Sequence, residues 1–116
     1  ANVVGKMTAI GDVEGRNVII LDDMIDTAGT ITMAADMLME KGAKSVRAVI
    51  THPVLSGAAY ERINASKLQE VIVTDTIPLN QEKDLSKFTV LSVADIFAEV
   101  IEHVHNYKEI SSLFYK

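Results

Sequence analysis

Apolar residues lie along the chain in short unbroken runs, separated by stretches in which they recur every three or four positions. The short runs are rich in Val and Ile and occupy residues 17–21, 45–51, 70–73 and 88–91. A short β-branched run without polar alternation is typical of a strand buried on both faces. A further short strand is expected at 6–10, before the turn-forming residues 11–15.

The stretches between these runs carry the period of a helix. From Ile31 onward the apolar residues share one helical face, and Gly42 is expected to end that helix. A second, short helix is expected at 56–64. A last helix opens at Ser92, which forms a pair resembling a capping box with Asp95. Its apolar positions are expected to face the core; these are Ile96, Phe97, Val100, Ile101 and Val104.

Strands that alternate with helices predict an α/β fold, here a three-layer, mostly parallel sheet flanked by helices. The 116 residues suit one domain, spanning 1–116. With 48% hydrophobic and 23% charged residues, the chain can form a core, which argues against intrinsic disorder.

The composition excludes several classes of function. A net charge of -5 argues against a nucleic-acid binder, which needs a basic surface. The absence of Cys excludes disulfides and Cys-ligated metals. No apolar run approaches the roughly 20 residues that cross a membrane. We therefore expect a soluble, cytoplasmic domain. Its first residue, Ala1, suggests that the chain begins inside a longer protein.

The segment 22–30 follows the first buried strand and carries the candidate chemistry. In an open α/β sheet, ligands bind beyond the carboxyl ends of the strands. Ala28 and Gly29 allow a close approach of the backbone to an anion, and Thr27 and Thr30 add hydroxyl donors. The helix that follows directs free N–H groups at the same place. The segment therefore has the composition of a phosphate-binding loop.

Asp22 and Asp23 are adjacent carboxylates at the end of that strand. They repel each other unless sugar hydroxyls, N–H groups or a divalent cation share the charge. No P-loop and no dinucleotide-binding glycine pattern occurs in the chain, so a sugar phosphate fits better than a nucleoside triphosphate. We therefore predict a ribose-phosphate site, with Asp22 and Asp23 as candidate metal ligands.

Simpler interpretations exist for several of these residues. An isolated Asp-Asp pair is more often a helix N-cap and a solvated loop residue than a binding site. His52 can reach a ligand or simply support its turn. His103 and His105 are two positions apart, so they point in different directions on a helix and cannot chelate one metal. The terminal apolar group at 113–115 is expected to pack on a neighbour.

The motif as a whole is more specific than its parts. Residues 18–30, Val-Ile-Ile-Leu-Asp-Asp-Met-Ile-Asp-Thr-Ala-Gly-Thr, resemble the phosphoribosyl-diphosphate signature of the type I phosphoribosyltransferase fold. Further matching segments at 11–15, 51–57, 61–64 and 73–78 make the chain similar to the ribose-phosphate diphosphokinase (PRPP synthetase) family. The resemblance runs essentially from end to end.

The resemblance implies that ATP and ribose 5-phosphate react, with Mg²⁺, to give phosphoribosyl diphosphate and AMP. It implies that Asp22 meets the ribose hydroxyls and that the loop holds the 5-phosphate. The implied ribose-5-phosphate residues are Asp22, Asp26, Thr27, Ala28, Gly29 and Thr30. It further implies a homo-oligomer in which dimers assemble into hexamers.

The family's chain is a tandem of two similar domains, and this sequence resembles only the second, carboxyl-terminal one. The family's catalytic Lys and Arg lie on a loop upstream of Ala1, so we expect no catalytic residue here. The amino-terminal domain's ATP-binding and Mg²⁺-binding residues, and the diphosphate loop, are also missing. The 116 residues alone are therefore expected to bind a sugar phosphate weakly and to be inactive.

Two other functions remain open at this point. A phosphoribosyltransferase uses the same loop but needs a hood that recognises the base, and the chain has no segment long enough to build one. A non-catalytic regulator of the same family can also retain such a loop for binding.

Overall fold

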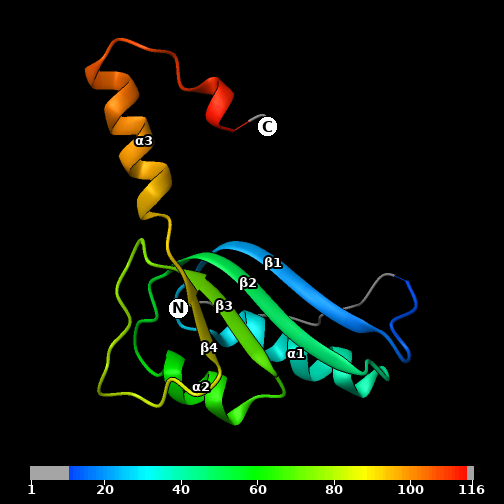
Figure 1. Cartoon of the computed structure of the whole chain (residues 1–116). Helices are drawn as coiled ribbons and strands as arrows, with labels where there is room; N and C mark the ends of the chain where they lie inside the picture. Colours follow the sequence, from blue (N-terminus) through cyan, green and yellow to red (C-terminus); the bar gives the residue numbers. More distant parts are fainter. Residues whose placement is uncertain (1–10, 115–116) are drawn as a thin grey trace.

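The computed structural model describes residues 11–114 and shows a mixed α/β chain (Figure 1). Its elements, in chain order, are β1 (Asn17–Ile25), α1 (Gly29–Glu40), β2 (Ser45–Pro53), α2 (Ala59–Ala65), β3 (Glu70–Thr74), β4 (Phe88–Leu91), α3 (Ala94–His105) and the short 3-10 helix η1 (Ser111–Leu113). Each of the strands predicted after residue 15 is present. The strand expected at 6–10 lies outside the described residues.

The strands form one parallel sheet in the order β1-β2-β3-β4. Ile20 is aligned with Ala48, Ala48 with Val71, and Val71 with Phe88, so the core positions form a row across the sheet. Parallel strands place their carboxyl ends at one edge of the sheet. The α/β fold with a parallel sheet and flanking helices is thereby confirmed.

The core lies between one face of the sheet and the helices α1 and α2 (Figure 1). Its fully buried residues from the sheet include Val46, Ala48 and Val71, and α1 contributes Ala35. At the β4 side, the Tyr60 ring from α2 lies 5.6 Å from the Phe88 ring, centroid to centroid. These contacts fix both helices against the strands whose ends carry the candidate site.

Helix α1 ends as predicted at a glycine. Gly42 has φ 94°, a left-handed conformation that favours glycine. The N–H of Gly42 donates to the carbonyl of Met39, and that of Ala43 to the carbonyl of Leu38. This pair of bonds is a Schellman motif, which satisfies the free carbonyls at the helix end.

The opposite face of the sheet carries no helix among residues 11–114 (Figure 1). Leu21 and Ile19 on β1 are 74% and 59% exposed, respectively. Both helices that pack on the sheet lie on its other face. The described part of the chain therefore shows two of the three expected layers in contact.

Helix α3 extends away from the sheet, and the prediction that its apolar side faces the core is wrong (Figure 1). No residue of α3 is buried, and Ile101 is 68% exposed. The expected capping pair is also not formed: the Ser92 hydroxyl donates to the Asp75 carboxylate and accepts from the Ala94 N–H, and neither bond involves Asp95. Amphipathic spacing indicates which face of a helix is apolar, but it does not indicate what covers that face.

Within residues 11–114, no helix has the length and apolar character needed to cross a membrane.

Candidate functional site

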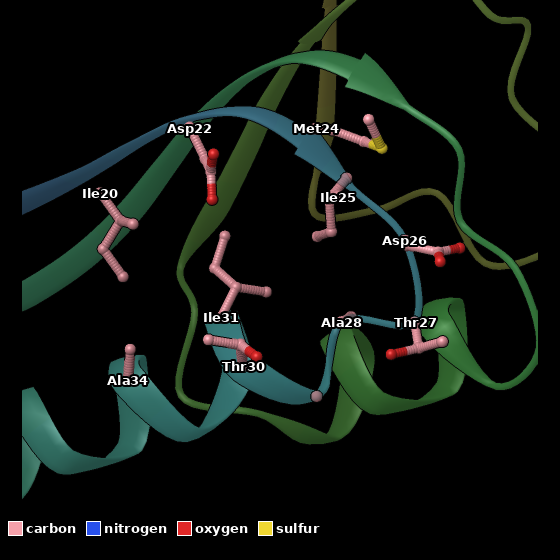
Figure 2. Close-up of a pocket in the computed structure, with 11 residues that line it drawn as sticks. Ile20, Asp22, Met24, Ile25, Asp26, Thr27, Ala28, Thr30, Ile31 and Ala34 are labelled. Carbon is pink, nitrogen blue, oxygen red and sulfur yellow. The ribbon is translucent and has the colours of Figure 1, made fainter. Parts of the chain in front are cut away.

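A cavity of about 250 Å³ lies where β1 ends and α1 begins (Figure 2). It is lined by Ile20, Asp22, Met24, Ile25, Asp26, Thr27, Ala28, Gly29, Thr30, Ile31 and Ala34. All the residues that the sequence assigned to ribose 5-phosphate line this cavity. Of these assigned residues, Asp22 comes from β1, Asp26, Thr27 and Ala28 come from the loop, and Gly29 and Thr30 come from the first turn of α1 (Figure 2).

The loop turns sharply at Ala28, whose φ of 67° is left-handed. An L-residue adopts this conformation only when its surroundings hold it there. The Ala28 side chain is buried, and the Ala28 carbonyl accepts bonds from the Thr32 N–H (3.1 Å) and the Thr32 hydroxyl (2.6 Å). The turn brings the start of α1 back toward Asp22.

The main-chain N–H groups of Thr27 through Ile31 make no hydrogen bond to an acceptor within the described residues. The first N–H groups of any helix lack intrahelical partners and carry the positive end of the helix dipole. Here they follow a tight turn and border a cavity, so they are available to an anion.

The carbonyls of the same loop are bonded by the segment that joins β2 to α2. The Leu55 N–H donates to the Ile25 carbonyl (3.0 Å), and the Ser56 N–H donates to the Asp26 carbonyl (2.9 Å). The Ser56 hydroxyl also donates to the Asp26 carboxylate. The Arg62 guanidinium donates to the Thr27 carbonyl at 2.8 Å. Sequence reasoning missed Ser56 and Arg62 as contributors, because each bond joins residues about 30 positions apart.

Asp22 and Asp23 do not act from the same side of the strand. Asp22 lines the cavity and is aligned with Ile50, on the face that the helices cover. Successive strand residues point to opposite faces, so Asp23 is directed to the open face. The Asp23 N–H donates to the Asp22 carboxylate at 2.8 Å. Among residues 11–114, no group of three or more His, Asp or Glu side chains is arranged to hold a metal.

In the part of the chain that the structure describes, the cavity lining contains carboxylates and hydroxyls but no Lys, Arg or His. His52 lies outside it: its Nδ1 is 2.9 Å from the Thr76 hydroxyl, at the carboxyl ends of β2 and β3. His103 bonds the Glu109 carbonyl near the end of α3. Among the described lining residues, the groups that can attract an anion are therefore main-chain N–H groups and hydroxyls rather than basic side chains.

The parallel sheet, with a cavity where β1 ends and α1 begins, defines an α/β domain with a candidate binding site at the carboxyl end of a strand. A family model described as "Phosphoribosyl synthetase-associated domain" matches residues 2–115, and the chain belongs to this family. The resemblance to the PRPP synthetase family is thereby confirmed.

Two relatives with more than half of the aligned residues identical to this chain share one name. The chain is 54% identical over 113 residues to "Ribose-phosphate pyrophosphokinase" of Oceanobacillus iheyensis, and 55% identical over 114 residues to the protein of the same name from Wolinella succinogenes. These matches cover 97% and 98% of the chain but 36% of each relative. The chain thus spans little more than a third of the length of these curated relatives.

A solved structure is similar as well. It is the crystal structure of phosphoribosylpyrophosphate synthetase from Mycobacterium smegmatis, with a TM-score of 0.81 and 45% identity. The match covers 84% of this chain and 33% of that chain.

Proposed function

We propose that this chain is the carboxyl-terminal part of a ribose-phosphate diphosphokinase and supplies its ribose-5-phosphate site. The single observation that carries the proposal is the row of N–H groups from Thr27 to Ile31, which find no acceptor among residues 11–114 and border the cavity that Asp22 also lines. The names of the relatives support a diphosphokinase over a phosphoribosyltransferase.

The two ends of the proposed substrate bind to different groups of the site. The 5-phosphate accepts hydrogen bonds from the N–H groups of the loop and from the Thr27 and Thr30 hydroxyls. The Asp22 carboxylate, on the strand side of the cavity, accepts hydrogen bonds from ribose hydroxyls (Figure 2). A phosphate bound at one end and a diol at the other fix the direction of the sugar in the site.

In the intact enzyme, the reaction transfers the diphosphoryl group of ATP to the sugar and releases AMP. The donor set fits Mg²⁺ in part, because Asp22 offers a hard carboxylate oxygen and Mg²⁺ is commonly held by one or two carboxylates plus substrate phosphates. Mg²⁺ would neutralise charge on the transferred group. The Asp23 carboxylate lies on the other side of the strand, so within this chain Asp22 is the better placed ligand.

We also propose that the parent protein is a cytoplasmic homo-oligomer. The exposed apolar side chains on the open face of the sheet, such as Leu21 and Ile19, support an association, because large exposed apolar patches mark interaction sites.

Calorimetry and NMR on the 116-residue chain test the ribose-5-phosphate site. We expect ribose 5-phosphate to bind, inorganic phosphate to compete with it, and ribose to bind more weakly than either. The amide signals of residues 27–31 should shift on binding. Replacing Asp22 with Asn should weaken ribose 5-phosphate more than inorganic phosphate, since only the sugar uses that carboxylate. Unchanged amide signals at 27–31 in saturating ribose 5-phosphate would contradict the proposal.

A further inference from the structure

The loop that joins β1 to α1 is bonded, through its carbonyl groups, to a second segment of the chain. Three consecutive carbonyls, those of Ile25, Asp26 and Thr27, accept hydrogen bonds from Leu55 N, Ser56 N and Arg62 Nη1, respectively. We call these three donor residues the β2–α2 clamp. The clamp is itself anchored, because α2 packs into the core through Ala59, Tyr60 and Ile63.

The clamp determines where the loop's N–H groups point. In a trans peptide unit, the C=O and the following N–H point in opposite directions, and no described peptide is cis. Holding the Asp26 carbonyl outward therefore turns the Thr27 N–H the other way. Holding the Thr27 carbonyl outward does the same for the Ala28 N–H. The outer bonds thus orient the inner donors toward the cavity.

The bond from Arg62 fixes the peptide next to the left-handed residue of the loop. The carbonyl it binds belongs to the peptide that immediately precedes Ala28, which has φ 67°. A left-handed alanine relaxes to ordinary conformations unless its neighbouring peptides are fixed. Arg62 is exposed and is not among the residues that line the cavity, and its connection to the cavity is the bond to the Thr27 carbonyl.

We propose that Arg62 is a positioning residue for sugar-phosphate binding, which it supports by fixing the Thr27–Ala28 peptide. This inference rests on the proposed function, since it assumes that the anion is bound by the loop. A charged donor suits the task, because hydrogen bonds from guanidinium groups are stronger than those from neutral donors.

Three variants of the 116-residue chain test the inference: R62M, R62K and R16M. R16M removes the same charge from an exposed arginine just before β1, at the other end of the strand from the cavity. Two properties are measured: the affinity for ribose 5-phosphate, and the intraresidue HN–Hα nuclear Overhauser effect of Ala28. That effect is strong at positive φ and weak at negative φ, and it is recorded without ligand.

We expect R62M to lower the affinity for ribose 5-phosphate roughly tenfold, and to weaken the Ala28 signal while the signals of the sheet stay in place. R62K should keep more of the affinity and more of the Ala28 signal than R62M does, and R16M should behave as the wild type. If R62M keeps both the Ala28 signal and the affinity, or if R16M loses as much affinity, the inference is overturned. If the wild type does not bind but R62M still alters Ala28, the proposed function fails while the positioning of the loop stands.

Discussion

At the scale of single residues, Ala28 and Gly29 are both small for different reasons. Ala28 is buried at a left-handed turn, where a bulky or β-branched side chain would be strained. Gly29 does not have the positive φ found at Gly42 and Gly57, so its backbone does not require glycine. A Cβ added at Gly29 would lie 3.8 Å from the Thr27 hydroxyl, an ordinary contact. The absence of a side chain at Gly29 therefore leaves space in the cavity that the residue borders.

Replacing Gly29 with Ala should separate folding from binding. We expect the free energy of unfolding to stay level or rise by up to about 1 kcal/mol, because alanine favours the helix more than glycine does. We expect the affinity for ribose 5-phosphate to fall roughly tenfold, because the methyl group would stand where the phosphate must approach the N–H groups. Urea unfolding and calorimetry measure the two effects. A stable variant with unchanged affinity would show that the phosphate does not bind at Gly29.

Glu109 provides a pH-dependent prediction outside the site. Hydrogen bonds from the hydroxyls of Ser111 and Ser112, together with the Ser112 N–H, lower the pKa of Glu109 to about 2 from its usual 4.5. Because the folded pKa is depressed, the contribution of these bonds is complete above pH 4.5 and is lost as the pH falls toward 2.

An NMR titration of the Glu109 carboxyl carbon measures this shift. We expect a midpoint near 2 in the wild type and a midpoint closer to 4.5 when Ser111 and Ser112 are both replaced with Ala. The signals of η1 should change over the same pH range as the carboxyl group. Titration of wild-type Glu109 at its ordinary pKa would show that the serine bonds do not persist in solution.

At the scale of elements, β1 and α1 could be predicted from the sequence because their signals are local. A β-branched run, a small polar loop and a helical period follow one another within residues 17–40, and Gly42 ends the helix. The contact between this unit and the β2–α2 clamp could not be predicted in the same way. The bond from Arg62 to Thr27 spans 35 positions, and an exposed arginine on a short helix gives no sign of its partner.

Helix α3 shows the limit of pattern reasoning at this scale. Its start is held by Asp75, whose carboxylate accepts bonds from the Ser92 hydroxyl (2.6 Å) and the Val93 N–H (2.9 Å). The bond from the Ser92 hydroxyl lowers the pKa of Asp75 most, and the bond from the Val93 N–H lowers it further. The carboxylate therefore acts in the ionised form, and its contribution is complete above its ordinary pKa of 3.8 and is lost as the pH falls below it.

Replacing Asp75 with Ala should loosen α3 without loosening the sheet. We expect amide hydrogen exchange to become faster at the start of α3, because the bonds that fix its first turn are lost, while exchange in β2 and β3 stays unchanged. The matched control is Asp84→Ala, which removes another exposed carboxylate that accepts a main-chain bond, from Ser86. Equal exchange rates in α3 for the two variants would rule out a role for Asp75 in holding the helix.

At the scale of the whole molecule, the described chain consists of a packed part and a projecting segment. Residues 17–91 form the sheet and its two packed helices, and α3 with η1 extends beyond them (Figure 1). The candidate site lies entirely within the packed part, so its geometry does not depend on where α3 lies.

Charge at the cavity leads to a prediction about the chain as a catalyst. Transfer of a diphosphoryl group requires cations that stabilise the charge developing on it, and positioned Lys, Arg and Mg²⁺ supply most of that stabilisation in phosphoryl transfer. The cavity offers Asp22, Asp26 and main-chain N–H groups, but no Lys or Arg among residues 11–114 lines it. On the proposed function these groups hold a sugar phosphate, but acidic and neutral groups cannot balance the negative charge of a transferred group.

We therefore expect the 116-residue chain to bind ribose 5-phosphate and yet to form no AMP from ATP, ribose 5-phosphate and Mg²⁺. An assay of AMP formation measures this, with a full-length ribose-phosphate pyrophosphokinase as the positive control. Calorimetry on the same preparation shows that the binding site is intact. AMP formation above the background of a heat-denatured sample would mean that residues of this chain stabilise the transferred group. Binding without turnover would instead assign this chain the positioning of the acceptor sugar and leave charge stabilisation to other parts of the enzyme.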